Sequence, residues 1–433
     1  VLDNPSTPPR NRFDWDSRSF GAEWGRRLSG LDARVLGWIA GGEAGADWML
    51  GNVPIRMDSE RNDFGFLASL ERSTPRSSTS LALRYDRSRT SYQIDSASDS
   101  VASWETRVET PVATLQATDD RGLDARTRLK LGLSLAANAG ILHADPRLGL
   151  ERTVGDRVTL GGYVGRTHQF HQSLRNAESV VSNIFPADLS LGSGDSGVPV
   201  ARSDQAVLSF DWRPDDSRHL SFEAYEREST GLLLVAPVDG APFTTGALAR
   251  GSGRSRGMSV EVGLTRERYG ILAGYGWQRT RLKAGELTYT PGHGTAHLLE
   301  GGFILFPTPS SSIRLGAAAG LGRQTTAIAG AFDWEACNLL DRGCEFTGNP
   351  DHTGEVPGGT ELPAYLRLDL GFRKRWTINV GNRNATLALF GTVTNLFNRQ
   401  NVLTYARDPA TGELAKIEMR PLSPLVVGLD WRF

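Results

Sequence analysis

The sequence predicts an all-β fold, a transmembrane antiparallel up-and-down β-barrel, and three observations lead to this prediction. Segments in which apolar and polar residues alternate recur along the whole chain, as in strands with one apolar face. The connections between these segments tend to alternate between short and long. The final segment, 425–433, alternates strictly and ends on Phe433, two residues after Trp431. Transmembrane barrels place such aromatic residues at strand ends, at the membrane interface.

Composition excludes several other classes of protein. The chain has 433 residues, with 48 Lys and Arg against 49 Asp and Glu, so no overall charge would attract nucleic acid. No run of about 20 apolar residues is present, as a transmembrane helix would require. A barrel remains compatible with this mildly polar sequence, because only alternate residues of its strands meet lipid. No linker or change in composition marks a domain boundary.

About seventeen segments are predicted to be strands, and most exceed the five or six residues usual in soluble sheets. In order, they are 13–28, 33–50, 61–74, 79–95, 105–118, 126–137, 146–153, 157–169, 203–213, 219–235, 257–267, 271–281, 297–306, 313–323, 362–376, 385–397 and 425–433. Turn-forming sequences between neighbours favour hairpins and hence antiparallel pairing. One of the clearest alternations places Leu129, Leu131, Leu133 and Leu135 on a single face.

The connections predict an orientation. Every other connection is a turn of about three to seven residues. The connections between those hairpins are often much longer, at 170–202, 236–256, 282–296, 325–361 and 398–424. Bacterial outer-membrane barrels have short periplasmic turns and long extracellular loops.

If Phe433 ends in the periplasm, segment 13–28 also runs inward and the number of strands is odd. Single-chain bacterial barrels have even numbers of strands, so either one strand is missed or earlier strands precede residue 1. We favour the second explanation. Residues 1–12 are then an extracellular loop or linker, and 13–433 form the C-terminal portion of a single barrel domain.

The aromatic residues and cysteines have structural interpretations. Trp376, Trp431 and Phe433 are predicted to belong to the aromatic girdle, with the chain's aromatic end acting as the barrel-insertion signal. Sugar binding is the alternative for these aromatic residues. Cys337 and Cys344 lie close together in a polar loop, which favours a disulfide in an oxidising compartment over two free thiols. Such a disulfide would stiffen an extracellular loop.

Charged residues on the polar faces of the strands are candidates for the lumen. They are Arg367, Asp369, Arg373, Asp430 and Arg432, together with Asp204, Glu223, Glu261 and Arg314. We expect interstrand ion pairs among them, and contact with a solute or a plug is the alternative. His168 and His171 lie at the mouth of a long loop, three residues apart, where they could contact a metal chelate. The alternative is a solvated loop end, and no resident metal site is predicted.

No enzyme signature is found, and no cofactor is expected. The run Gly-Ser-Gly-Asp-Ser-Gly at 192–197 is similar to a serine-hydrolase nucleophile sequence. It lies in a predicted extracellular loop and has no assigned His or Asp partner. A phosphate-binding Gly-x-x-x-x-Gly-Lys sequence is also absent. The sequence therefore predicts a protein that is not an enzyme.

Several segments resemble the barrel domain of TonB-dependent outer-membrane receptors. Residues 362–375 (LPAYLRLDLGFRKR) are similar to the family's antepenultimate strand, 394–401 (TNLFNRQN) to the exit of the penultimate strand, and 425–433 to the terminal strand. Weaker similarities lie at 146–150, 223–225, 231–233 and 253–257. The resemblance implies a barrel of about 22 strands, of which roughly five would precede this chain. It also implies a plug domain and a TonB box, which are not found here.

The resemblance implies a receptor that imports a large, scarce solute such as a ferric chelate, cobalamin or an oligosaccharide. Its partners would be outer-membrane lipid, the barrel-assembly machinery, TonB acting through the missing plug, and a small-molecule or chelate ligand. Its location would be the bacterial outer membrane. Two alternatives stay open: a passive porin of 16 or 18 strands, and a surface-exposed β-rich adhesin. A coding sequence with only a signal peptide upstream would favour the porin, and extraction without detergent the adhesin.

Overall fold

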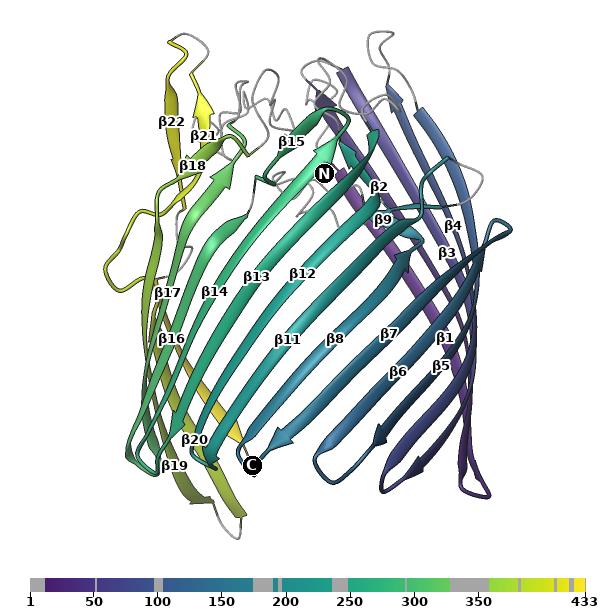
Figure 1. Ribbon diagram of the computed structural model, residues 1–433. Helices are drawn as coiled ribbons and strands as arrows, with labels where there is room; N and C mark the ends of the chain where they lie inside the picture. The colour runs from purple at the N-terminus through teal and green to yellow at the C-terminus, as the bar shows by residue number, and fades with distance from the viewer. Residues whose placement is uncertain are drawn as a thin grey trace.

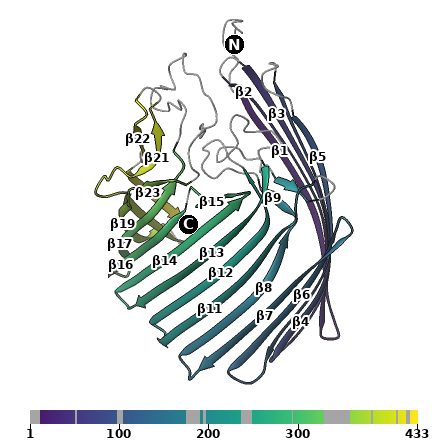
Figure 2. The same ribbon diagram turned by 45° about the horizontal axis from the view of Figure 1, so that its top comes forward.

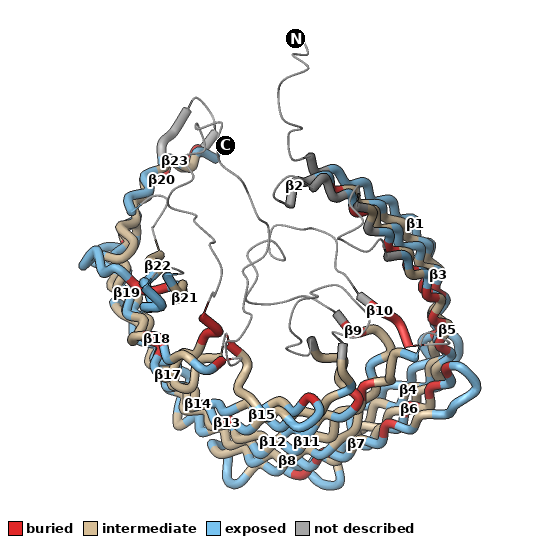
Figure 3. Tube along the Cα trace, turned by 90° about the horizontal axis from the view of Figure 1, so that it is seen from above, coloured by how far each residue is buried: buried red, intermediate tan, exposed pale blue. Residues whose placement is uncertain are grey.

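In the computed structural model, one large antiparallel sheet curves into a wall around a wide lumen (Figures 1 and 3). The structure describes residues 12–50, 53–96, 104–173, 190–193, 197–235, 248–292, 294–327, 358–380, 383–408, 411–419 and 424–432. Among these residues, no helix is long and apolar enough to cross a lipid bilayer.

The strands follow the chain order around the wall. They are β1 (Arg12–Leu28), β2 (Leu31–Leu50), β3 (Val53–Thr74), β4 (Ser77–Ser96), β5 (Trp104–Gly122), β6 (Thr127–Asn138), β7 (Ile141–Val154), β8 (Val158–Gln169), β9 (His171–Ser173), β10 (Ser190–Gly192), β11 (Ala201–Asp215), β12 (Arg218–Val235), β13 (Leu248–Thr265), β14 (Tyr269–Ala284), β15 (Leu287–Tyr289), β16 (Thr295–Thr308), β17 (Ser311–Thr325), β18 (Thr360–Leu362), β19 (Tyr365–Val380), β20 (Arg383–Val393), β21 (Val402–Arg407), β22 (Leu414–Glu418) and β23 (Leu425–Arg432). The main sheet has 19 strands, while β9 pairs with β10 and β21 with β22. Apart from the three-residue β15 and β18, the main sheet contains seventeen long strands. The prediction of an antiparallel barrel wall with about seventeen strands is confirmed.

The wall is not closed within the described part of the chain. There, β1 pairs with β2 and β23 pairs with β20, and neither edge strand has a partner on its other side. Figure 3 shows the opening between β23 and the β1–β2 hairpin. Backbone N–H and C=O groups at such an edge would lack partners in lipid, at a cost of several kcal/mol for each group.

Connections differ between the two ends of the wall. Short turns gather at the end where β23 finishes, and the small strands β9, β15, β18, β21 and β22 lie toward the opposite end (Figures 1 and 2). We call these the turn end and the loop end. Two connections at the loop end are also short. β2 ends at Leu50 and β3 begins at Val53, and Ala139 and Gly140, both with positive φ, join β6 to β7.

Several predicted boundaries were wrong, including the starts of β7 at Ile141 rather than 146 and of β13 at Leu248 rather than 257. Two others have a clear physical reason. β3 begins at Val53 rather than 61, because residues 58–63 are polar on both faces of the strand and interrupt the alternation. β20 ends at Val393 rather than 397, because Asn395 adopts a left-handed conformation with φ 52°. The backbone N–H of Asn395 then donates to Asp369 Oδ1 at 2.8 Å instead of continuing the strand.

The small hairpin β9–β10, here called the inner hairpin, identifies the lumen face of the wall. It lies inside the ring (Figure 3), and its Gly192 packs directly against the side chain of Thr110 on β5. Thr90 and Thr110 are only 2% and 1% exposed. Because paired residues of neighbouring strands share a face, the strand registers extend this assignment around the wall.

The opposite, outer face carries a band of exposed apolar side chains, here called the apolar band. Its members include Phe20, Ile39, Phe64, Leu83, Leu115, Leu133, Leu150, Leu160, Leu208, Val262, Ile271, Phe303, Leu315, Leu370 and Leu429. Leu208 is 65% exposed and Leu429 69%. A continuous belt of exposed apolar side chains is the feature of a surface that meets lipid.

Candidate solute-binding lumen

Ion pairs line the lumen face of the wall. They include Glu23–Arg34, Arg61–Asp63, Arg84–Asp86, Arg128–Asp120, Lys130–Glu151 and Arg367–Asp369. Their side chains are partly exposed, so each pair stabilises the fold by at most about 1 kcal/mol. Their main effect is to hold charges of both signs at fixed positions around the lumen.

The five charged residues assigned to the lumen near the C-terminus lie together on the lumen face of β19 and β23. Arg367 contacts Asp369 at 2.8 Å within β19. Arg373 reaches past β20 to Asp430 at 3.4 Å, and Arg432 contacts the same carboxylate at 3.1 Å. Of these three ion pairs, only Arg373–Asp430 joins different strands, and contact with a solute stays a prediction.

One other charge assigned to the lumen was placed on the wrong face. The registers put Glu223, Glu261 and Arg314 on the lumen face, as predicted. Asp204 instead lies on the outer face, where Arg166 contacts it at 2.6 Å. β11 extends beyond the apolar band at the loop end, and there a charged residue can face outward.

The inner hairpin is fixed to the wall through the buried side chain of Gln172. Its Nε2 donates to the carbonyl of Pro199 at 2.7 Å and to the carbonyl of Gly231 at 2.9 Å. Its Oε1 accepts the backbone N–H of Leu233 at 2.7 Å. The contact with Gly231 is buried and the other two are partly buried, so loss of the amide side chain would be costly.

A β-bulge in β12 makes this contact possible. The register of β12 with β13 shifts between Thr230 and Leu232, which leaves Gly231 outside the ladder. Gly231 has φ 69°, and a Cβ there would lie 2.5 Å from the carbonyl oxygen of Val200. Both facts require glycine at this position.

A second attachment lies at the other end of the inner hairpin. Asn138, only 3% exposed, donates from Nδ2 to the carbonyl of Pro111 at 2.9 Å and to that of Ser193 at 3.2 Å. The backbone N–H of Ser193 donates to the carbonyl of Phe170 at 2.7 Å. The inner hairpin is thus a fixed polar element inside the lumen, close to the loop end.

His168 occupies a different environment from a solvated loop end. It belongs to β8, and its side chain is 10% exposed. Its backbone N–H and its Nδ1 both contact the carboxylate of Asp145, at 3.3 and 2.5 Å, where β7 is no longer hydrogen-bonded to β8. His143 stacks obliquely on the His168 ring with centroids 4.8 Å apart. His168 therefore joins two strands, and its contact with a chelate stays a prediction.

His171 lies on the inner hairpin itself and faces β3 and β4. Burial lowers its pKa from the ordinary value of 6.5, and the positive charge of Arg61 lowers it further. The carboxylates of Asp63 and Asp86 act in the opposite direction. His168 and His171 are therefore close in sequence but serve different contacts.

The remaining predicted residues divide into two groups. Trp376 and Trp431 lie on the outer face at the turn end, 42% and 46% exposed, each directly opposite Leu387 of β20. This position is compatible with the aromatic girdle, and the girdle role of both residues stays a prediction. Phe433, Cys337 and Cys344 lie outside the described residues, so the insertion signal and the disulfide stay predictions.

Gln172, Asn138 and Ser193 were not predicted from the sequence. A single Gln, Asn or Ser next to a connection is common, and only the fold shows which backbone groups it satisfies. Within the described ranges, no group of three or more His, Cys, Asp or Glu could hold a metal ion.

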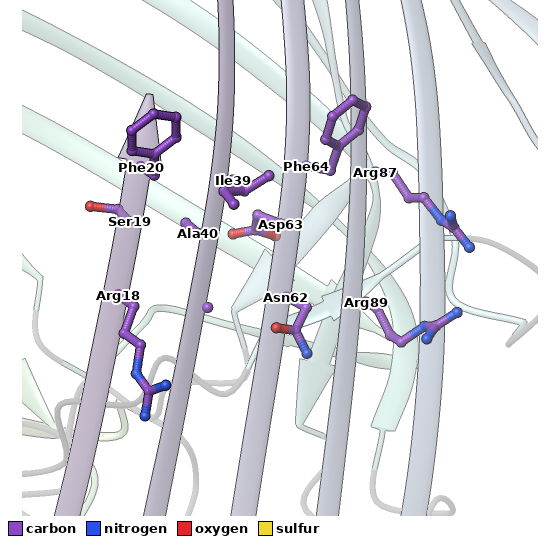
Figure 4. Close-up of a pocket in the computed structure, with 11 residues that line it drawn as sticks. Arg18, Ser19, Phe20, Ile39, Ala40, Asn62, Asp63, Phe64, Arg87 and Arg89 are labelled. Carbon is purple, nitrogen blue, oxygen red and sulfur yellow. The ribbon is translucent and has the colours of Figure 1, made fainter. Parts of the chain in front are cut away.

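A hollow on the outer face lies across β1 to β4 (Figure 4). Apolar side chains of the band, including Phe20 and Phe64, line one part of it, and Arg18, Arg87 and Arg89 line another. The registers place these side chains on the outer face, so this hollow does not belong to the lumen.

No family model and no curated protein matches the sequence. Solved structures do match the fold. The ferric citrate transporter FecA in its unliganded form aligns with 97% of this chain and 62% of its own, with a TM-score of 0.62 and 11% identity. The ferric-catecholate import receptor Fiu from E. coli K12 aligns with 98% of this chain and 65% of its own, with a TM-score of 0.61 and 11% identity. The copper transporter OprC aligns with 93% of this chain and 64% of its own, with a TM-score of 0.64 and 11% identity.

These matches establish a fold and its extent. The chain spans less than two thirds of the length of each of these three proteins. All three are transporters or receptors rather than enzymes. At 11% identity the likeness concerns the backbone alone, and it agrees with the resemblance seen in the strand sequences. The wall described here has the fold of the barrel part of TonB-dependent outer-membrane receptors.

Proposed function

We propose that this chain is the C-terminal portion of the barrel of a TonB-dependent transporter in the bacterial outer membrane. The transporter imports a large, scarce solute, and among the candidate classes a ferric or other metal chelate is favoured. The observation that carries the proposal is the fold match over almost the whole chain with proteins named as metal and ferric-chelate transporters.

The unpaired edges of the wall support the same proposal. β1 and β23 each have one partner in the described part of the chain. Further strands between these two edges would satisfy the exposed backbone groups and widen the lumen. Such a barrel is wide enough to enclose a plug, and TonB would act on that plug.

The lumen supports transport of a polar solute. Ion pairs of both signs line the wall, and the inner hairpin adds polar groups near the loop end, where a solute would enter. The apolar band faces lipid, and the girdle residues fix its height. Together, these features support a membrane-facing outer surface of the wall and a water-filled route through the lumen.

Uptake in cells tests the proposal. The complete open reading frame that encodes this chain would be expressed in E. coli lacking its own iron receptors, with and without TonB. Uptake of ⁵⁵Fe-citrate, a ⁵⁵Fe-catecholate and ⁶⁴Cu would be measured. We expect TonB-dependent uptake of at least one probe. Permeation of small solutes that does not require TonB would instead indicate a porin, and extraction from cells without detergent would indicate a surface adhesin.

A further inference from the structure

Charged residues form a row across the outer face at the loop end of the apolar band. The registers place Arg166 opposite Asp204, Asp204 opposite Glu228, Glu228 opposite Arg254, and Arg254 opposite Arg281. Arg166 contacts Asp204 at 2.6 Å, and Arg254 contacts Glu228 at 3.4 Å. The row thus begins with opposite charges and ends with two arginines directly facing each other on β13 and β14.

The adjacent row repeats this arrangement. Glu226 lies opposite Arg256 and contacts it at 3.3 Å, and Arg256 lies opposite Arg279. Like charges directly opposite each other destabilise a sheet. Within the described part of the chain, neither Arg279 nor Arg281 forms a salt bridge, and both side chains are exposed. Lys283 follows on the same face, so cations outnumber carboxylates on β12, β13 and β14 here.

The height of these arginines on the wall is set by their neighbours along β14. Reading from the turn end, the outer face of β14 carries Ile271, Tyr275 and Trp277, followed by Arg279 and Arg281. Tyr and Trp mark the membrane interface. The arginines therefore lie one step beyond the girdle, at the level of lipid headgroups in the leaflet at the loop end.

The hollow in Figure 4 holds a second basic cluster of the outer face, which includes Arg18, Arg87 and Arg89. There Arg87 and Arg89 both contact Glu109, at 2.7 and 2.9 Å. Arg18 contacts Asp16 at 2.7 Å. These arginines have partners within the chain, whereas Arg279 and Arg281 face arginines. Of these two described clusters, the β13–β14 cluster is the one with positive charge that carboxylates of the chain do not neutralise.

We propose that Arg254, Arg256, Arg279 and Arg281 form a site for a phosphate-bearing lipid headgroup of the leaflet at the loop end. Phosphate suits this site, because the guanidinium fork binds phosphate oxygens in pairs and two facing arginines can share one phosphate. The girdle residues Tyr275 and Trp277 lie next to the acyl region of the same lipid. This proposal rests on the membrane location given under the proposed function.

Lipid binding to the full chain in a nonionic detergent tests the site. Native mass spectrometry would count bound diphosphoryl lipid A during a titration, with phosphatidylcholine as the lipid with a zwitterionic headgroup. The test variant is R279Q/R281Q. The matched control is R266Q/R268Q, which removes two exposed arginines from the turn at the other end of the same β13–β14 hairpin. A heat-dependent shift in gel mobility would show that each variant is folded.

We expect R279Q/R281Q to bind lipid A about 30-fold more weakly, because each basic residue near an anionic lipid surface contributes about fivefold. The control would change by less than about twofold, and phosphatidylcholine binding would not change. R279K/R281K, which keeps the charge but loses the fork, would fall between wild type and R279Q/R281Q. It also provides a second folded variant if R279Q/R281Q does not fold.

Three results would overturn the site. They are unchanged lipid A binding in R279Q/R281Q, equal losses in the test and control variants, and a loss that phosphatidylcholine shares. The uptake experiment is independent of this measurement. TonB-dependent uptake with unchanged lipid A binding rejects the site alone, whereas selective lipid A binding without uptake rejects the transport role alone.

Discussion

The two faces of the same strands differ in their side chains, which are apolar on the outer face and charged and ion-paired on the lumen face. On β19, Leu366, Leu370 and Phe372 face outward, and their side chains are 41%, 37% and 45% exposed. These apolar side chains cannot form hydrogen bonds with water. Between them, Arg367 and Asp369 face the lumen and bind each other. The outer face is uniform along the strand, whereas the lumen face varies from residue to residue. This difference is what the proposed function requires, with an outer face that meets lipid and a lumen face that meets the solute.

The largest effect should come from placing a charge on the outer face. Leu370→Arg puts a guanidinium near the middle of the apolar band and should reduce the free energy of unfolding by about 2–4 kcal/mol. Urea titration of the barrel refolded in phospholipid vesicles would measure it. Thr392→Arg on the lumen face of the neighbouring β20 is the matched control and should cost less than about 1 kcal/mol. Equal costs for the two variants would show that the faces are not distinguished by lipid.

A smaller loss of stability is expected when the buried polar side chain that holds the inner hairpin is removed. Gln172→Ala would leave the carbonyl of Gly231 and the N–H of Leu233 without the partner that Gln172 provides. We expect a local cost of about 1–3 kcal/mol, seen as faster hydrogen exchange in the inner hairpin and in β12 near its bulge. Gln278→Ala, on an exposed residue of β14 away from the inner hairpin, is the control. Unchanged exchange in Gln172→Ala would mean that the inner hairpin is held by other contacts.

Docking of the inner hairpin should depend on pH through His171. Burial lowers the pKa of His171 below 6.5, so the undocked state binds a proton that the docked state does not bind. Docking is therefore strongest above pH 6.5 and weakens as the pH falls from 6.5 toward the lowered pKa. Hydrogen exchange of residues 171–173 at pH 7.5 and 5.5, corrected for the intrinsic exchange rate, would show this weakening. His171→Gln should abolish the dependence, and His219→Gln, at a half-exposed lumen histidine paired with Glu261, should keep it.

The smallest effect is expected from an ion pair on the lumen wall. Arg373→Gln removes one of two arginines that contact Asp430, and all three side chains are partly exposed. The expected loss of stability is below about 1 kcal/mol, measured in the same urea titration. A loss as large as that of Leu370→Arg would show that lumen charges, rather than the apolar band, determine stability.

Much of the wall could be predicted from the sequence because the outer face obeys one rule. Strands such as 128–135 and 425–432 alternate so regularly that the face of each residue follows from the pattern, and the short turns between strands predict antiparallel pairing. The prediction was wrong where the rule no longer applies. Beyond the apolar band both faces are polar, so the start of β3 and the outward position of Asp204 could not be recognised from alternation.

The lumen could be predicted only in part. Charges on regular strands, such as Arg367 and Asp369, were placed on the correct face by their apolar neighbours. The inner hairpin was not predicted, because its attachment depends on Gln172 and Gly231, which are 59 residues apart. Neither the β-bulge at Gly231 nor the single amide side chain of Gln172 produces a periodic pattern that can be recognised in the sequence. The burial of His168 was not predicted, because its partner, Asp145, lies on another strand.

The central claim is that the apolar face of these strands meets lipid and the charged face meets water. Spin labels placed one at a time at residues 366 to 372 of β19, with Cys337 and Cys344 replaced by Ser, test it in membranes. Collision with oxygen should peak at 366, 368, 370 and 372, and collision with a water-soluble nickel chelate should peak at 367, 369 and 371. Equal access of the nickel chelate to both sets, or no alternation, would contradict the account.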